Sequence, residues 1–162
     1  MNLTRQHHTV VLRHRKENLK KCSLTGLESR KDMCFFSYPT DILPDLSEYV
    51  LLAMNAPSLS KDDGERGLFL IDATWRYAEK MDRFVASHQQ VAKRSLPSGW
   101  KTAYPRKQED CPNPEHGLAS IEALFAAYHI LGWSTEGLLD HYYWKDLFIQ
   151  KNEKLISFNL FE

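Results

Sequence analysis

Short apolar runs alternate with amphipathic stretches along the chain, and this alternation predicts the secondary structure. Residues 68–71 form an unbroken apolar run opened by Gly67, a pattern typical of a strand buried on both faces. Similar runs predict strands over 9–12, 33–37 and 50–54. Because helical patterns separate these runs, we expect an α/β fold with a mainly parallel sheet sandwiched by helices.

Apolar residues recur at three- and four-residue spacing after residue 74, which predicts an amphipathic helix. Its inward face would consist of Trp75, Ala78, Met81 and Val85. Asp72 or Thr74 can cap the first turn of this helix. The segment Asp72-Ala73-Thr74-Trp75 thus joins the carboxyl end of a buried strand to a helix, a place where open α/β sheets bind ligands.

Three further helices are expected from the pattern. One runs over 118–131, and Gly132 is a typical residue for its end. Ser134 can cap a last helix that runs to residue 148. A short helix is expected over 25–31, after the first strand and a basic segment.

The chain has 162 residues, about the size of one ordinary domain. We therefore expect a single domain over 1–162 with a frayed segment at 1–8. No segment approaches the roughly 18 uninterrupted apolar residues of a membrane span, and none resembles an export signal. Cys22, Cys34 and Cys111 are not spaced as a zinc pair or a redox motif, which favours reduced thiols, a cytoplasmic location and no metal.

Basic side chains gather in two places, although 21 basic and 21 acidic residues cancel over the whole chain. The first group is Arg13, Arg15, Lys16, Lys20 and Lys21, and the second is Lys93, Arg94, Lys101, Arg106 and Lys107. Such runs are often no more than a solvated surface. They are also typical of a surface that binds a polyanion, and both interpretations stay open.

Two acids are candidates for chemistry. Asp72 lies at the strand-to-helix junction, and Glu122 lies in the first turn of the expected helix over 118–131. Each has a purely structural alternative, as a helix cap or as an acid that complements the helix dipole. Alternatively, Ser120 and the free N–H groups of that helix would bind the polar end of a ligand while Glu122 orients substrate or moves a proton. The chain contains no Walker loop, GxGxxG or GxSxG sequence, so the usual nucleotide-binding and hydrolase motifs are missing.

Four segments, in order along the chain, resemble one enzyme superfamily. They are Lys20-Lys21-Cys22-Ser23, Asp72-Ala73-Thr74-Trp75, residues 118–123 and residues 143–152. The second matches the D-x-T-W signature of the DTW-domain proteins. The others resemble the Lys-Cys-Ser/Thr, Leu-Ser-Thr/Ser-x-Glu-Ala and aromatic-Trp-Gly-x-x-Phe-x-x-x-Asn elements of the small-subunit rRNA aminocarboxypropyltransferases of ribosome biogenesis.

This resemblance implies an enzyme that uses S-adenosylmethionine without a metal. Such an enzyme transfers the 3-amino-3-carboxypropyl group to the nitrogen of a uridine or modified uridine in tRNA or rRNA, and leaves methylthioadenosine. The resemblance also implies a SPOUT-like fold with a C-terminal trefoil knot, and a monomer.

The family pattern assigns three groups of residues. The cofactor pocket would be lined by Ser23, Ile71, Asp72, Trp75, Leu96 and Ser120. RNA phosphates would be bound by Arg13, Arg15, Lys16, Lys20, Lys21, Arg106 and Lys107. The uracil imide must lose a proton, so a carboxylate is the natural base, with Asp72 as the first candidate and Glu122 as the second. Either acid could instead hold the amino group of the transferred moiety.

Two alternative functions remain beside this hypothesis. A SPOUT-type RNA methyltransferase would use the same cofactor but transfer its methyl group. A non-catalytic RNA-binding or ribosome-assembly protein would keep the fold without turnover. The second alternative is motivated by Lys145, which stands where the family has Gly, and by the lack of the N-terminal cysteine cluster of the DTW tRNA enzymes.

Overall fold

The computed structural model describes residues 9–16, 22–105 and 117–159. The chain divides into two compact units, and each is described by itself. Unit 1 consists of Met1–Pro57 and Glu65–Ser95, and unit 2 consists of Ser58–Gly64 and Leu96–Glu162. The expected single domain therefore stays a prediction.

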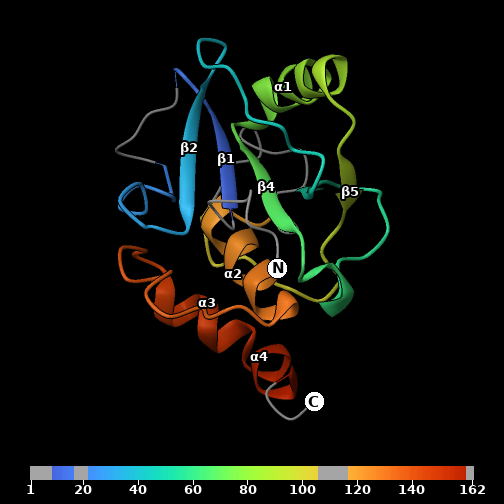
Figure 1. The fold of residues 1–162 in the computed structure, drawn as a ribbon. Coiled ribbons are helices and arrows are strands. Elements are labelled where there is room, and N and C mark those ends of the chain that lie inside the picture. Colours follow the sequence, from blue (N-terminus) through green and yellow to red (C-terminus); the bar gives the residue numbers. More distant parts are fainter. Residues whose placement is uncertain (1–8, 17–21, 106–116, 160–162) are drawn as a thin grey trace. The chain divides into compact units, whose positions relative to one another are not determined.

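Unit 1 contains a five-stranded sheet in which every pair of neighbouring strands is parallel. The strands are β1 (Thr9–His14), β2 (Met33–Tyr38), β3 (Tyr49–Leu52), β4 (Gly67–Asp72) and β5 (Ala92–Arg94). Their order is β2-β1-β4-β3-β5 (Figure 1). The α/β class, the parallel sheet and the four predicted strands are thus confirmed, whereas the short edge strand β5 was not predicted.

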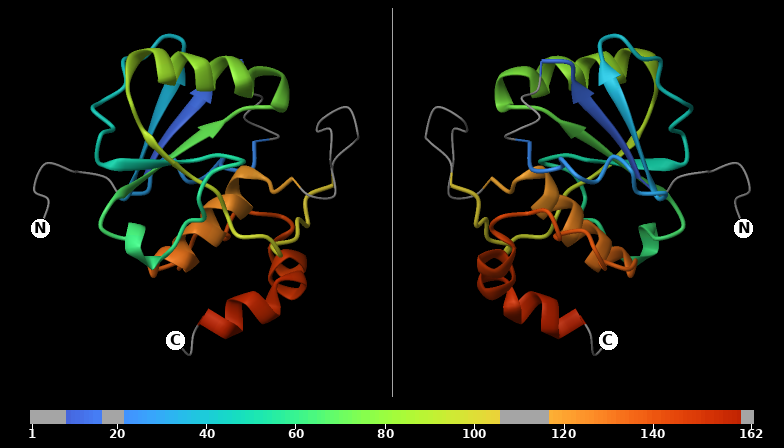
Figure 2. Two further views of the ribbon diagram at one scale, coloured as in Figure 1. Left: turned by 90° about the vertical axis from the view of Figure 1, so that its right-hand side faces the viewer. Right: turned by 90° about the vertical axis from the view of Figure 1, so that its left-hand side faces the viewer.

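The predicted helix after residue 74 is confirmed as α1 (Trp75–His88), which lies across the sheet of unit 1 (Figure 2). Met81 and Val85 are buried and pack with Phe69 of β4 and Leu51 of β3 into one apolar core. Burial of these side chains is what holds the helix on the sheet.

Gly67, which opens β4, is required by packing. A Cβ atom at this position would lie 2.3 Å from the ring of Tyr49, on the neighbouring strand and in direct register with Gly67. No side chain fits in that space, so the glycine permits the close pairing of β3 and β4.

Unit 2 is helical, with η1 (Lys61–Asp63), α2 (Ser120–Leu131), α3 (Lys145–Lys151) and α4 (Glu153–Asn159). Helix α2 ends at Gly132, which adopts φ 79°, a left-handed conformation that glycine accepts readily. The predicted helix and its end are therefore confirmed. None of the described helices is long and apolar enough to cross a membrane.

Two helix predictions are wrong, and glycine conformation explains both. Residues 25–31 form successive turns, in which Thr25 N–H donates to Cys22 O and Leu27 N–H to Leu24 O, and Gly26 adopts φ 103°. The last helix does not begin at Ser134, because the chain makes turns around Gly137 at φ 80° and becomes helical at Lys145. A left-handed residue interrupts the hydrogen-bond ladder of an α-helix.

Candidate functional site

The carboxyl ends of β1 and β4 are neighbours in the sheet of unit 1, with Arg13 and Asp72 in direct register. From β1 the chain continues to β2 on one side, and from β4 it continues through α1 to β5 on the other side (Figure 1). Ligands bind to open parallel sheets at such a switch point, outside the carboxyl ends of the strands. Asp72 therefore ends β4 at the position that sheet topology favours for a site.

Asp72 is 5% exposed, and its carboxylate takes part in contacts with β1 and the loop that follows it. Its Oδ2 accepts hydrogen bonds from the thiol of Cys22 at 3.1 Å and from Nε of Arg13 at 3.4 Å. The N-cap residue of α1 is Thr74 and not Asp72. The contacts of Asp72 to Cys22 and Arg13 are therefore not those of a helix cap.

The Cys22 thiol is a hydrogen-bond donor at neutral pH. Burial, followed by the charge and hydrogen bond of Asp72, raises the pKa of Cys22 to about 12. The thiol therefore keeps its proton, which points at the Asp72 carboxylate. The sequence indicated Cys22 as part of a motif, but this partner is 50 residues away and no local pattern connects the two.

Arg13 is held inside this network, with 11% of its side chain exposed. Its Nη1 donates to Glu28 at 3.1 Å, and its guanidinium lies 4.6 Å from the centre of the Phe35 ring. Burial by itself lowers the pKa of Arg13, but Cys22, Glu28 and Asp72 together hold it above its usual value, so the guanidinium stays charged. Its neighbours Arg15 and Lys16 are exposed. The predicted basic group of 13–21 thus contains two different environments.

Exposed cations surround His14 at the same edge of the sheet. The His14 ring stacks on Tyr77 at 4.1 Å, and its Nδ1 accepts a hydrogen bond from the backbone N–H of Lys16. Burial and the nearby charges of Lys16, Arg15 and Lys80 lower the pKa of His14, so the ring is neutral at physiological pH. Lys80 and Arg76, one turn apart on α1, are both exposed and were missed at the sequence level, since charges on a helix usually only face solvent.

The structure places the other predicted site residues in different surroundings. Ser23 is partly buried in the turns after Cys22, and Ile71 packs at the margin of the core of unit 1. Trp75 begins α1, but its side chain is outside the described part of the structure. Leu96 and Ser120 belong to unit 2. The remaining RNA-binding candidates, Lys20, Lys21, Arg106 and Lys107, lie outside the described residues.

Glu122, in unit 2, is completely buried and accepts four hydrogen bonds. Oε1 accepts from Thr102 Oγ1 at 2.6 Å and from Ala119 N at 2.8 Å. Oε2 accepts from Ala103 N at 2.7 Å and from Tyr142 Oη at 3.0 Å. A carboxylate offers about four acceptor positions, so the described donors already occupy the capacity of Glu122.

Asn152 holds the same backbone segment from its other end. Its Oδ1 accepts from Lys101 N at 2.7 Å, and its Nδ2 donates to Lys101 O at 2.9 Å. Glu122 and Asn152 thus fix four consecutive residues, 101–104, with Tyr104 N–H closing a turn on Thr102 Oγ1 at 3.0 Å. Both acceptors come from the segments that carried the family resemblance, and in unit 2 these segments build one scaffold.

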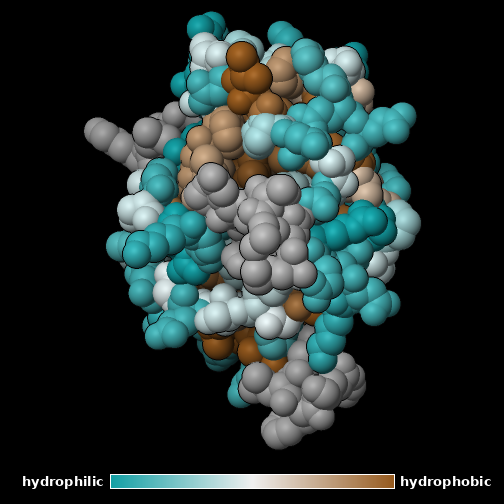
Figure 3. Space-filling model, in the orientation of Figure 1, coloured by the Kyte–Doolittle hydropathy of each residue, from teal (hydrophilic) through white to brown (hydrophobic). Residues whose placement is uncertain are grey.

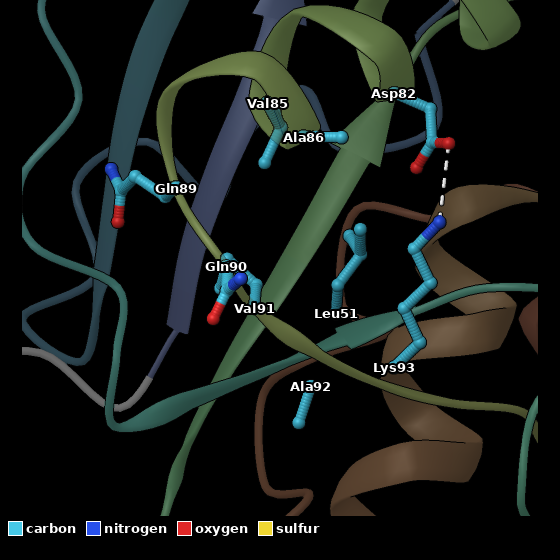
Figure 4. A pocket seen from close by; sticks show the side chains of 9 residues that line it. All are labelled: Leu51, Asp82, Val85, Ala86, Gln89, Gln90, Val91, Ala92 and Lys93. Carbon is cyan, nitrogen blue, oxygen red and sulfur yellow. Dashed lines mark hydrogen bonds and ion pairs between the residues drawn. The ribbon is translucent and has the colours of Figure 1, made fainter.

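A cavity on unit 1 is lined by other residues. It has a volume of about 410 Å³ and lies between the end of α1 and strands β3 and β5, with Leu51, Val85 and Val91 among its lining residues (Figure 4). An ion pair of Asp82 with Lys93, at 3.2 Å, borders it. Much of the surface seen in Figure 3 is hydrophilic, and apolar surface gathers at the end of unit 1 where α1 lies. The lining of the cavity contains none of the residues predicted for the cofactor or RNA sites.

The sheet and the polar network at its switch point define an α/β protein with a candidate ligand site at the carboxyl ends of β1 and β4. Within the part of the chain that the structure describes, no three metal-binding side chains come together. No family model and no curated protein sequence matches the chain significantly.

Among solved structures, the chain is similar to the SAM-dependent rRNA:acp-transferase Tsr3 from Vulcanisaeta distributa. The TM-score is 0.67 at 25% sequence identity, and the similarity covers 92% of this chain and 80% of the other.

Proposed function

We propose that this protein is an S-adenosylmethionine-dependent transferase that attaches a 3-amino-3-carboxypropyl group to uridine or a modified uridine in RNA. The observation that carries the proposal is the structural similarity to an rRNA:acp-transferase over 92% of the chain. The motif segments around Cys22 and Asp72 support it, because their side chains meet at a switch point suited to a ligand. The Vulcanisaeta protein acts on rRNA, which makes small-subunit rRNA the first substrate to test and tRNA the second.

The chemistry assigns a task to Asp72. The bound donor would supply an electrophilic carbon attached to a sulfonium. The bond between this carbon and sulfur breaks as the carbon bonds to the uracil nitrogen. The imide proton must then be taken up, and a carboxylate within hydrogen-bond reach of that nitrogen is suited to accept it. Asp72 either performs this step or holds the ammonium of the transferred group. Ser23, Ile71 and Trp75 of unit 1 remain proposed for the cofactor pocket, and Leu96 and Ser120 of unit 2 stay predictions of the family pattern.

Glu122 is better suited to positioning than to proton transfer. Its two oxygens hold residues 102 and 103 and the start of α2. A base needs a free acceptor position for the proton that it takes, and four donors compete for the positions of Glu122. We therefore assign the proton or ammonium contact to Asp72 alone and give Glu122 the role of shaping the segment over 101–104.

RNA phosphates would meet the exposed cations next to this site. Arg15 and Lys16 follow β1, and Arg76 and Lys80 add to them from α1. Lys20, Lys21, Arg106 and Lys107 stay in the proposal on the family pattern, whereas Arg13 is paired with Asp72 and Glu28 and is less suited to an RNA phosphate. The SPOUT-like trefoil knot, the monomeric state and the cytoplasmic location likewise stay proposals.

Double labelling of the donor tests the function. The protein is incubated with total RNA and S-adenosylmethionine labelled either in the methyl carbon or in the carboxypropyl carbons. We expect carboxypropyl label in RNA and methyl label in released methylthioadenosine. Methyl label in RNA would instead identify a methyltransferase. A chain that does not bind S-adenosylmethionine in calorimetry would be a non-catalytic RNA-binding protein.

A further inference from the structure

One donor of the Arg13 guanidinium finds no acceptor in the described part of the chain. Nε of Arg13 faces Asp72 and Nη1 faces Glu28, but Nη2 is buried without a hydrogen-bond acceptor among the described residues. Leaving a buried, charged donor unpaired is costly, and native structures seldom retain one without a function. A ligand with a hydrogen-bond acceptor would supply the missing partner of Nη2.

We propose that Arg13 binds the carboxylate of the aminocarboxypropyl group, and so selects a donor that carries an amino acid end. This inference rests on the proposed function and deepens it. A guanidinium matches a carboxylate in shape and charge and presents its N–H groups in a fixed plane. Phe35 beneath the guanidinium and the bonds to Asp72 and Glu28 hold that plane before a ligand arrives.

The position of Arg13 fits the reaction geometry. Arg13 and Asp72 are register partners on β1 and β4, and Oδ2 of Asp72 is 3.4 Å from Nε of Arg13. A short carbon chain separates the donor's carboxylate from its reacting carbon. A carboxylate held by Arg13 therefore keeps the reacting carbon close to Asp72.

The charge of the network also fits this ligand. Asp72 and Glu28 outnumber the single guanidinium, so the network is negative. S-adenosylmethionine has a sulfonium and an ammonium against one carboxylate, and is positive. Glu28 is the exposed member, with 39% of its side chain accessible, so a ligand would approach the network from its side.

Calorimetry with three ligands tests the assignment: S-adenosylmethionine, its decarboxylated analogue and methylthioadenosine. We expect the wild-type protein to bind S-adenosylmethionine about 10- to 100-fold more tightly than the decarboxylated analogue, the effect of one charged hydrogen-bonded contact. In Arg13→Gln this ratio should fall to about one, while binding of methylthioadenosine stays within about twofold. Arg30→Gln is the matched control, because Arg30 is paired with Asp32 at 2.9 Å, and it should keep the wild-type ratio.

Equal affinity of the wild-type protein for the first two ligands would overturn the inference, and so would an unchanged ratio in Arg13→Gln. If that variant does not fold, Arg13→Lys takes its place: it keeps the charge but not the planar fork, and the ratio should fall at least threefold. An unchanged ratio there would overturn the inference as well. Failure of the wild-type protein to bind any of the three ligands would contradict the proposed function itself.

Discussion

Two buried acids, Asp72 in unit 1 and Glu122 in unit 2, were both candidates for chemistry by sequence, and they differ in their surroundings. Glu122 receives four hydrogen bonds of 2.6–3.0 Å, three of them from residues that it thereby fixes in place. Asp72 accepts from a thiol at 3.1 Å and from a guanidinium at 3.4 Å, both weaker contacts by distance or by donor type. The guanidinium itself has one buried nitrogen, Nη2, for which the described residues offer no acceptor.

The contrast indicates how a carboxylate that stabilises local structure differs from one that can contact a ligand. A carboxylate whose acceptor positions are filled by backbone and hydroxyl donors stabilises local structure, and a ligand could engage it only by breaking those bonds. A carboxylate with long contacts to a partly satisfied partner can exchange them for contacts to a ligand at small cost. Burial alone therefore does not distinguish the two roles, whereas the length and donor type of the contacts to Cys22 and Arg13 set Asp72 apart from Glu122.

The largest effect is expected at Asp72. Asp72→Asn keeps the size of the side chain and a hydrogen-bond acceptor, but removes its ability to take a proton or hold an ammonium. Transfer of carboxypropyl label to RNA should fall by about 1000-fold, the middle of the range for a general base. The free energy of unfolding in urea should fall by about 1.5 kcal/mol at most, the loss of one hydrogen bond to a charged group.

Two results for Asp72→Asn would contradict the assignment of chemistry to Asp72 and of structural support to Glu122. Full activity in Asp72→Asn would remove Asp72 from the chemistry. Loss of cooperative unfolding in the same variant would mean that Asp72, like Glu122, is primarily a structural residue.

Glu122→Gln should lower the free energy of unfolding more than Asp72→Asn does. The glutamine amide presents an NH₂ group to two of the four donors, so two buried donors lose their acceptor at about 1.5 kcal/mol each. We expect urea unfolding to show a loss of about 3 kcal/mol. The affinity for methylthioadenosine should be retained in the fraction that remains folded.

Tyr142→Phe is a matched control for Glu122→Gln, because it removes one of the four donors and leaves no buried donor unpaired. Its cost should be about 1 kcal/mol. A loss in Glu122→Gln no greater than that in Tyr142→Phe would show that the four-donor network is not what stabilises this segment.

The sequence predicts those parts of the fold that depend on local periodicity. The apolar run over 68–71 and the spacing of Met81 and Val85 identify β4 and α1. A strand buried on both faces is apolar throughout, and a helix buried on one face is apolar at helical spacing, so both can be recognised from the sequence. The turns over 25–31 were mistaken for a helix because backbone conformation at Gly26 depends on contacts that composition does not reveal. The carboxylate of Glu28, which accepts from Gly26 N–H at 2.7 Å, is one of them.

The candidate site is less predictable than the fold, for a physical reason. Asp72 and Glu122 were found by position and resemblance, but their roles depend on donors far along the chain, such as Cys22 for Asp72 and Tyr142 for Glu122. The basic run over 13–21 did not show that Arg13 turns inward, since alternation along a strand decides which face a residue joins only once the neighbouring strands are known.

The free energy of unfolding, measured against pH, tests the hydrogen bond between the Cys22 thiol and Asp72. Its pKa is raised from 9.0 to about 12 in the folded protein, so folding favours the protonated thiol. The contribution is fully present below about pH 9 and is lost as pH rises towards 12, by up to about 1.4 kcal/mol per pH unit. We expect the free energy of unfolding to fall between pH 9 and 10.5 in the wild-type protein and to fall less steeply in Cys22→Ala. Parallel slopes in the two proteins would exclude a thiol held protonated beside Asp72.

The smallest effect is expected at the rim of the site, where the cations are exposed. Lys80→Gln removes one charge from the surface next to His14, and RNA affinity should fall by only about threefold at moderate salt. The slope of log affinity against log salt should decrease by about one, as expected for one lost phosphate contact, and S-adenosylmethionine binding should not change. Lys93→Gln is the control, because Lys93 is paired with Asp82 at 3.2 Å and should leave both the affinity and the slope as in the wild type. If the two variants behave alike, the cations of α1 and the end of β1 are an ordinary solvated surface, and RNA would have to be bound by another part of the chain.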